Sequence, residues 1–325
     1  MAERLSDGPR DVLITGAGGF VGRQLVAALA ADRVGLGRLI ATDLRLPKAP
    51  IEGVEYKTLD IRDAAAVDAA LAGSGRTVDV VVHLAAVVTP GKEDTREFQR
   101  QVDVGGTRNL LDACAAHGVK KLVYTSSGAA YGYHADNAAL LDEDAPLRGN
   151  EVFAYAWHKR LVEEMLAEHR AAHPELAQLI FRVSTILGPS VHNQITAMFE
   201  RPVVLGLRGV DTPFCFVDDA DVVECLARGA RGDQTGVFNL TGDGVMTLRE
   251  IAAAMGRRFV ALPAGWVERG LKLLHGAKLS PYGPEQVLFL QHRPVLYNQR
   301  LKAAFGDLPR RSSREVFARY RESRA

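Results

Sequence analysis

The sequence contains few cysteines, and their pattern excludes two common classes of small or metal-bound protein. Only three occur in 325 residues, at Cys114, Cys215 and Cys225. Their spacing matches no metal-ligand motif, and an odd number does not form a disulfide framework. We therefore expect no metal site, and a chain that works in a reducing compartment.

The sequence also lacks an excess of charge of either sign and any long apolar run. Lys and Arg total 40 against 39 Asp and Glu, so no overall field would gather nucleic acid or an anionic membrane. No run approaches the ~18 apolar residues of a membrane helix, and no apolar leader precedes the first strand. We expect a cytoplasmic protein with a small-molecule partner, without nucleic acid or membrane partners.

In their place, the first half shows a regular alternation of two kinds of segment. Runs rich in Val and Ile occur at 11–16, 38–43, 54–60, 78–86, 120–127 and 176–184. Ala-rich segments with helical composition lie at Val21–Ala31, Ala64–Ala72, Glu97–His117 and Tyr155–His173. This alternation predicts an α/β fold with a doubly wound parallel sheet and helices on both faces.

The second half has a looser pattern, with prolines at 189, 202 and 213 and a further strand at 236–242. We predict a dinucleotide-binding domain over 1–185, to which 216–242 returns. A smaller substrate-binding domain would comprise 186–215 and 243–325, with helices at Leu248–Arg257, Pro263–His275 and 312–323.

Two segments of the second half need an interpretation of their own. We interpret Pro263–His275, with Trp266, Leu271 and Leu274, as a lid or core helix, with membrane contact as the alternative. The basic C-terminal end is interpreted as a solvated helix face. Its arginines are Arg310, Arg311, Arg314, Arg319, Arg321 and Arg324.

A glycine-rich loop stands between the first strand and the first helix. In "ITGAGGFVGRQLV" the glycines are Gly16, Gly18, Gly19 and Gly22. Without β-carbons the backbone can turn sharply and approach a pyrophosphate, and the helix N-terminus supplies N–H groups and partial positive charge. The loop therefore predicts dinucleotide binding.

Acidic residues at strand ends indicate which dinucleotide it is. Asp43 ends the second strand, where a carboxylate can accept hydrogen bonds from the adenosine ribose and repel a 2′-phosphate. This favours NAD, although neighbouring Arg45 could pair with the phosphate of NADP. Asp60 and Ile61 end the third strand, either beside the adenine or in a surface turn.

The order of motifs resembles the extended short-chain dehydrogenase/reductase family, also called the NAD-dependent epimerase/dehydratase family. The motifs are "TGAGGFVG", "DI", "HLAA", "GGTRNLLDA", "TSSGAAYG" and "YAWHK". The resemblance covers 11–189 closely and reaches about residue 242 more loosely. It implies a Rossmann fold and dimers formed through the helices at Glu97–His117 and Tyr155–His173.

The resemblance also implies roles for individual residues. The loop residues Phe20 and Val21 and the stretch Leu84, Ala85 and Ala86 would contact the dinucleotide. Ser127 and Tyr155 would face the substrate, and Lys159 would hold the nicotinamide ribose.

The spacing of Tyr155 and Lys159 agrees with those roles. Residues i and i+4 differ by about 40° around a helix and about 6 Å along it, so the two side chains share a face. A nearby ammonium should lower the pKa of the phenol, so that Tyr155 exchanges a proton with the substrate oxygen. Ser127, at the end of its strand, would anchor that oxygen; Ser126 is the alternative.

Three other polar residues near these motifs receive structural interpretations. We expect His83 and Tyr131 to pack beside the cofactor, and His158 to face away from Tyr155. Asp103 is a departure from the family, which commonly has asparagine there.

Further departures bear on the reaction. Sugar-nucleotide dehydratases of the family carry an Asp-Glu pair where this chain has Gly128 and Ala129, so dehydration lacks its proton carriers. Enzymes of nucleotide sugars usually have asparagine and arginine at the positions of Thr185 and Thr212, although Arg208 and Arg293 could substitute. The apolar residues Phe214 and Phe216 and the segment "VLFLQHRPVLY" favour a pocket for a less charged substrate.

These observations lead to one function and two alternatives. We predict an NAD-dependent oxidoreductase that interconverts a secondary alcohol and a ketone through Ser127, Tyr155 and Lys159. The alternatives are a nucleotide-sugar epimerase, and a binding protein that senses NAD without turnover.

Overall fold

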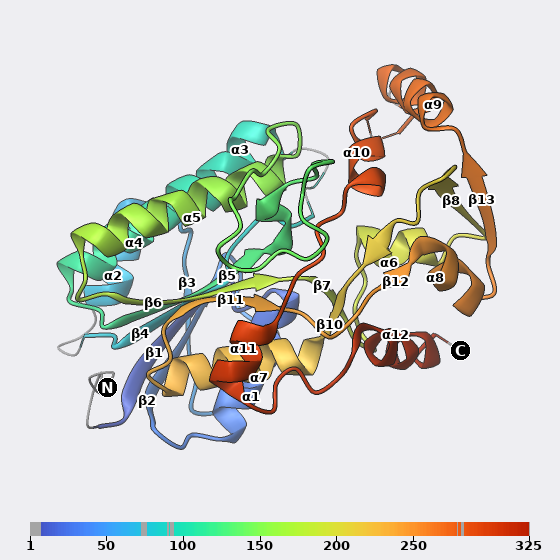
Figure 1. Ribbon diagram of the computed structural model, residues 1–325. Coiled ribbons are helices and arrows are strands. Elements are labelled where there is room, and N and C mark those ends of the chain that lie inside the picture. Colours follow the sequence, from blue (N-terminus) through green and yellow to red (C-terminus); the bar gives the residue numbers. More distant parts are fainter. Residues whose placement is uncertain are drawn as a thin grey trace.

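The computed structural model describes residues 8–72, 77–89, 91, 94–277, 279–280 and 283–324. Its centre is a seven-stranded parallel sheet in the order β11-β6-β5-β4-β1-β2-β3 (Figure 1). The strands are β1 (Arg10–Thr15), β2 (Leu36–Asp43), β3 (Glu55–Thr58), β4 (Val80–His83), β5 (Lys121–Ser127), β6 (Ala177–Val183) and β11 (Gly236–Leu240). The predicted α/β fold is confirmed, while residues 1–7, used above to argue against a leader, lie outside the described part.

Helices cover both faces of the sheet, which explains why its strands are apolar on both sides. One face carries α1 (Phe20–Ala31) and α7 (Asp219–Arg231), which share a core with the strands. The other carries α2 (Ala64–Ala72), α4 (Gly106–Ala116) and α5 (Ala154–Ala172). The strand order reverses between β1 and β4, so the segments that follow these two strands lead to opposite faces of the sheet and leave a crevice at its carboxyl edge.

The segment predicted as one helix at 97–117 is divided in three. It consists of α3 (Arg96–Arg100), a turn of π-helix, η1 (Gln101–Gly105), and α4. Thr107 Oγ1 donates to the carbonyl of Asp103 at 2.6 Å within this irregular turn. A β-carbon on Gly106 would lie 2.0 Å from Ile61 Cγ1, so the helix approaches the neighbouring loop closely. Turns of π-helix of this kind are frequent at functional sites.

Beyond β6 the chain builds a second layer of short elements beside the sheet. Three strand pairs form it: β7 (Thr185–Leu187) with β10 (Phe216–Asp218), β8 (Val203–Leu207) with β13 (Arg258–Leu262), and β9 (Pro213–Phe214) with β12 (Met246–Thr247). The accompanying helices are α6 (Gln194–Phe199), α8 (Leu248–Ala254), α9 (Ala264–Gly276), α10 (Gln286–Gln291) and α12 (Ser313–Glu322). All of these elements except α9 contribute to a separate aromatic core. In contrast, α11 (Gln299–Phe305) packs its buried Phe305 into the core on the α1 face of the sheet. The proposed domain boundaries stay a prediction.

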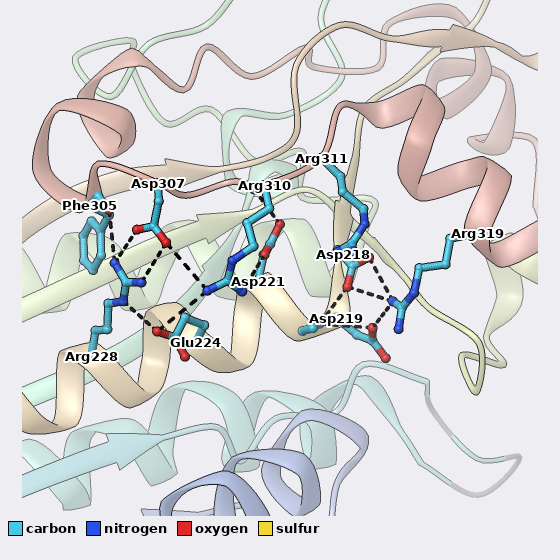
Figure 2. A network of polar contacts seen from close by, with 11 residues as sticks. Asp218, Asp219, Asp221, Glu224, Arg228, Phe305, Asp307, Arg310, Arg311 and Arg319 are labelled. Atoms are coloured by element: carbon cyan, nitrogen blue, oxygen red, sulfur yellow. Dashed lines mark hydrogen bonds and ion pairs between the residues drawn. The ribbon is translucent and has the colours of Figure 1, made fainter. Parts of the chain in front are cut away.

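The interpretation of the basic C-terminal end as a solvated face holds only in part. Arg310, Arg314 and Arg321 are exposed, but five of the six arginines form ion pairs, as Figure 2 shows for Arg310, Arg311 and Arg319. Arg311 and Arg319 reach the buried carboxylate of Asp218, and Arg310 reaches Asp221. Asp218 also caps α7, since it accepts a hydrogen bond from the amide of Ala220 at 3.0 Å. Arg314 and Arg324 pair with Glu250 and Glu200. The basic end is therefore fastened to the N-terminus of α7 and its surroundings.

Among the described residues, no helix is both long and apolar enough to cross a membrane. No group of three or more His, Cys, Asp or Glu side chains within that part of the chain is arranged to hold a metal ion. The three cysteines are buried and free.

Candidate functional site

A cleft of about 1080 Å³ lies at the carboxyl ends of the sheet strands and extends beneath α6 and α10. It collects nearly every residue that the sequence marked for cofactor or catalysis. Those that line it are Gly16, Gly19, Phe20, Val21, Gly22, Asp43, Asp60, Ile61, Leu84, Ala85, Ala86, Ser127, Tyr155 and Lys159. Gly18 does not line it and instead donates its amide to Asp43 Oδ2 at 2.9 Å.

The glycine loop is shaped so that no larger residue fits. Gly16 has a φ of 68°, and a β-carbon there would lie 2.6 Å from the amide nitrogen of Ala85. A β-carbon on Gly22 would lie 2.2 Å from the carbonyl of Gly16. The loop thereby brings the N-terminus of α1 to the cleft, where N–H groups and the helix dipole suit a pyrophosphate. The residues present fit the dinucleotide that was predicted.

The two acidic residues predicted at the adenosine end, Asp43 and Asp60, make different contacts. Asp43 lines the cleft at the end of β2 and is held by Gly18, whereas Arg45 does not line it. Asp60 is bound by its own turn, because the amide and guanidinium of Arg62 both donate to its carboxylate. This pairing lowers the pKa of Asp60. Asp60 thus fixes a turn and also lines the cleft, and its place beside the adenine stays a prediction.

Ser127 and Tyr155 meet in the cleft at the end of β5. Both side chains line the cleft, the Ser127 hydroxyl acts to lower the pKa of the Tyr155 phenol, and Ser127 Oγ accepts from the amide of Ala129 at 3.1 Å. Ser126, the alternative, is 3% exposed and donates to Glu163 Oε1. The hydroxyl available to a substrate beside Tyr155 is therefore that of Ser127.

Lys159 lies below Tyr155 on α5, with its ammonium buried. Its Nζ donates to Tyr124 Oη at 2.9 Å and to the carbonyl of Thr125 at 2.7 Å. It stands 5.7 Å from the centre of the Tyr155 ring. Burial lowers the pKa of Lys159 to about 8, although the carboxylates of Asp103 and Glu163 act to raise it.

The expectation of a lowered pKa for Tyr155 is wrong. Desolvation in the recessed cleft raises the pKa of the phenol to about 12, and the neighbouring hydroxyl of Ser127 offsets only part of this rise. Lys159 does not offset this desolvation, because its N–H groups donate to Tyr124 and Thr125. It makes no hydrogen bond to Tyr155 that would stabilise a phenolate.

Two of the residues interpreted as structural are indeed buried and fully engaged. His83 is 1% exposed and lies between the hydroxyls of Thr15 and Thr107, at 2.7 and 3.0 Å. Its burial, with the charge of Lys159, lowers its pKa to about 3, so the ring is neutral. Tyr131 is fully buried, and its hydroxyl bonds Asn239 and the guanidinium of Arg182.

Asp103 and His158 form a pair behind the cleft wall. His158 Nδ1 lies 2.9 Å from Asp103 Oδ2, and both residues are buried. Oδ1 of Asp103 accepts from the amide of Val87 at 2.8 Å. Neither side chain lines the cleft. His158 thus turns to a different flank of α5 from Tyr155, and Asp103 reaches the cofactor side only through Val87.

The substrate half of the cleft contains one guanidinium between aromatic rings. Arg293 lies 4.0 Å from the centre of the Phe214 ring and 4.4 Å from that of Phe289, and it donates to Thr185 Oγ1 at 3.1 Å. Its Nε and Nη1 are buried without a hydrogen-bond partner among the described residues. Arg208 is exposed and does not line the cleft, so only Arg293 of the two proposed substitutes is placed to meet a substrate.

The two phenylalanines expected to form the pocket belong to the core instead. Phe214 and Phe216 are fully buried, stack on each other and contact Phe199. The prediction that both line a substrate pocket is therefore wrong. The side chain of Thr212 does not line the cleft either, and its hydroxyl donates to the carbonyl of Leu290 at 2.6 Å.

Parts of the cleft wall had no clear signal in the sequence. Tyr133, Phe153 and Phe289 form an aromatic cluster there, with the ring of Tyr133 4.9 Å from Phe153 and 5.4 Å from Phe289. Only the segment "VLFLQHRPVLY", which contains Phe289, was marked as apolar. Tyr133 directly follows the "YG" motif, a proximity that could have marked it.

Helix α9 stands at the mouth of the cleft. Val267 and Leu271 line the cleft, whereas Trp266 is 67% and Leu273 75% exposed. The helix has no buried residue, which excludes the reading as a core helix. A lid position fits the two cleft-lining residues, and it stays a prediction.

A doubly wound parallel sheet with a glycine loop and a Ser-Tyr-Lys set at its carboxyl edge defines the extended short-chain dehydrogenase/reductases. The chain belongs to the NAD dependent epimerase/dehydratase family, whose model matches residues 12–240. The family is NAD-dependent, and the predicted cofactor NAD is confirmed. The predicted family is confirmed as well.

Relatives and solved structures agree with this assignment. A Mycobacterium tuberculosis protein designated Rv0501 is 25% identical over 317 residues, 96% of this chain and 83% of the relative. Short-chain dehydrogenase/reductase family 42E member 1 of Danio rerio is 38% identical over 117 residues, 35% of this chain and 28% of the relative.

Among solved structures, an Agrobacterium tumefaciens short-chain dehydrogenase/reductase superfamily protein with bound NAD superposes with a TM-score of 0.72. It is 21% identical and covers 96% of both chains. UDP-glucose 4-epimerase of Thermotoga maritima, with UDP-glucose, gives a TM-score of 0.71 at 21% identity over 96% of this chain and 98% of that one. At these identities the likeness shows the fold.

Proposed function

We propose that the protein is an NAD-dependent oxidoreductase that interconverts a secondary alcohol and a ketone. The observation that carries the proposal is that Ser127, Tyr155 and Lys159 line one cleft, with the Lys159 ammonium buried 5.7 Å from the centre of the Tyr155 ring. Two hydroxyls on one side of a cleft can hold and protonate a substrate oxygen.

Each residue of the set has a distinct role in the proposal. Bound NAD supplies the hydride chemistry. Ser127 holds the substrate oxygen, and Tyr155 gives a proton to it in ketone reduction or takes one in alcohol oxidation. Lys159 places a positive charge below Tyr155, so that the phenolate left after proton donation is partly compensated.

The raised pKa of Tyr155 determines which proton transfer this residue is ready to make at neutral pH. With a pKa of about 12, Tyr155 is a phenol and can donate a proton. In ketone reduction, Tyr155 can therefore donate the proton that it already carries. In alcohol oxidation, Tyr155 must first lose that proton. Oxidation should accelerate as pH rises until Lys159, with a pKa of about 8, loses its charge.

Water elimination does not fit the cleft. Gly128 and Ala129 line it where a dehydratase needs an acid and a base, and a β-carbon on Gly128 would meet Leu296 Cδ1 at 3.0 Å. Neither residue carries a group that can transfer a proton.

The variant Tyr155→Phe tests the proposal. Wild-type protein with NAD and a panel of secondary alcohols should produce NADH, and Tyr155→Phe should lose at least 100-fold in kcat, about the contribution of a positioned acid or base. The matched control is Tyr297→Phe, which removes a hydroxyl from a surface tyrosine outside the cleft. Undiminished turnover in Tyr155→Phe would exclude the assignment.

A second function, epimerisation of a nucleotide sugar, is favoured by Arg293. Arg293 lines the substrate half of the cleft, and its buried Nε and Nη1 lack partners in the described chain, so a diphosphate in contact with this side chain would supply acceptors. Sugar nucleotides should then raise the melting temperature of the wild type, and Arg293→Met should lose that rise. No stabilisation by any sugar nucleotide would exclude this function.

The proposal also includes the substrate class, the location and the oligomeric state of the protein. We infer a small-molecule substrate, a cytoplasmic location, and a homodimer formed through α4 and α5. Sedimentation at several protein concentrations tests the dimer.

A further inference from the structure

Asp103 connects three elements immediately behind the cleft. The side chain projects from η1, accepts the amide of Val87 at 2.8 Å, and lies 2.9 Å from His158 Nδ1 on α5. Val87 follows Ala86 in the loop after β4, which lines the cofactor side of the cleft. One carboxylate therefore ties that loop to the helix that carries Tyr155 and Lys159.

The chemistry of a carboxylate fixes the hydrogen-bond pattern. An ionised carboxylate only accepts, so the two nitrogens that face it must both carry hydrogen. Asp103 therefore keeps the hydrogen of His158 on Nδ1. An asparagine at 103 could also accept the Val87 amide and contact His158, but it would bring no charge.

That charge matters because His158 directly precedes Lys159. The ionisable groups facing Lys159 are Tyr124 on β5, His83 on β4, Tyr155 and Glu163 on α5, and Asp103 on η1. Tyr124 and His83 are neutral near pH 7, because burial raises the pKa of the former and lowers that of the latter.

The two carboxylates in this set are not equivalent. Glu163 is bound by the guanidinium of Arg182, with Nη2 2.8 Å from Oε2 and Nε 3.0 Å from Oε1. Asp103 has no arginine or lysine partner in the described chain, and its second oxygen meets only the ring of His158. Asp103 is therefore the carboxylate whose charge acts on Lys159 without an opposing guanidinium.

We propose that Asp103, held by His158, is a positioning residue that fixes the loop after Ala86 to α5 and supplies the negative charge that keeps Lys159 an ammonium. The proposal rests on the proposed function, in which Lys159 acts in its protonated form. It assigns a role to a residue at which the chain departs from the asparagine common in the family.

Two substitutions separate the charge from the packing. Asp103→Asn keeps the size of the side chain and the acceptor for Val87 but removes the charge. His158→Gln keeps both the carboxylate and an N–H donor to it. The readouts are the pH dependence of kcat and the titration of Lys159, followed by NMR in protein labelled at the lysine ε-carbons and assigned with Lys159→Arg.

Asp103→Asn should move both the alkaline limb of kcat and the Lys159 midpoint to lower pH by about one unit, as expected from losing a nearby opposite charge. His158→Gln should leave both at or above their wild-type positions. A midpoint that does not fall in Asp103→Asn, or falls equally in His158→Gln, would overturn the proposal. If Asp103→Asn does not fold, the double variant with His158→Gln pairs two carboxamides, and the same fall is expected.

The NMR titration needs no turnover, so the two proposals can fail separately. A falling midpoint in a protein that oxidises no alcohol would refute the proposed function and leave the role of Asp103. Alcohol oxidation by the wild type, with an unchanged Lys159 midpoint in Asp103→Asn, would support the proposed function and refute the role of Asp103.

Discussion

Lys121 shows at the scale of a single residue how burial changes a charged side chain. It is fully buried at the start of β5, and its Nζ donates to the carbonyls of Gly229 and Gly232 at 2.7 and 2.9 Å. These carbonyls belong to the last turn of α7 and its C-cap, so Lys121 caps that helix from within. Burial and the charge of Arg10 lower the pKa of Lys121 to about 7, against an attractive contribution from Asp233.

This lowered pKa predicts a pH-dependent contribution to stability. Between pH 7 and 10.5 the unfolded chain binds a proton at Lys121 that the folded chain does not, so stability rises with pH there. Below pH 7 both states are protonated and the slope disappears. The free energy of unfolding of the wild type should therefore rise relative to Lys121→Met by up to about 1.4 kcal/mol per pH unit above pH 7. Urea unfolding of both proteins at two pH values measures it; a constant difference would contradict the prediction.

At the scale of single residues, the sequence predicted which residues line the cleft better than it predicted their pKa values. The family resemblance implied the roles of Ser127, Tyr155 and Lys159, a helical spacing and a strand end agreed with them, and all three line one cleft. The pKa of Tyr155 did not follow, because spacing along a helix reveals neither burial nor the competing acceptors Tyr124 and Thr125.

At the scale of elements, α7 and α12 are joined by a network that the sequence did not reveal. Asp218 is 1% exposed and serves at once as N-cap of α7 and as partner of Arg311 and Arg319 (Figure 2). The helix at 312–323 was predicted from its composition, whereas α7 was not among the predicted helices. Their pairing was not predictable, because the arginines and aspartates lie about a hundred residues apart in the chain.

Removal of Asp218 should weaken the attachment of the C-terminal helix. Asp218→Ala loses the cap, leaves Arg311 without its carboxylate and leaves Arg319 with Asp219 alone, which should cost on the order of 2–4 kcal/mol of unfolding free energy. Arg314→Ala breaks the exposed pair with Glu250 and should cost less than about 1 kcal/mol. Chemical denaturation of both variants makes the comparison, and equal losses would contradict the role given to Asp218.

At the scale of the whole molecule, the sheet could be predicted from local sequence patterns, whereas the second layer could not. The sheet was predictable because its strands are short Val- and Ile-rich runs between helices, a pattern that local sequence carries. The second layer is built from strands of two to five residues paired across long separations, such as β8 with β13. The substrate half of the cleft, with Arg293 between Phe214 and Phe289, depends on that layer, so the substrate was the part that sequence did not determine.

The most direct test of the central claim is whether NADH accumulates beyond the amount of enzyme. An oxidoreductase releases one NADH for each alcohol oxidised, whereas an epimerase returns the hydride and leaves no net NADH. With wild-type protein, excess NAD and a panel of secondary alcohols, NADH absorbance should rise to many equivalents of enzyme. Absorbance that never exceeds one equivalent with any alcohol, together with epimerised sugar nucleotide in the same preparation, would contradict it.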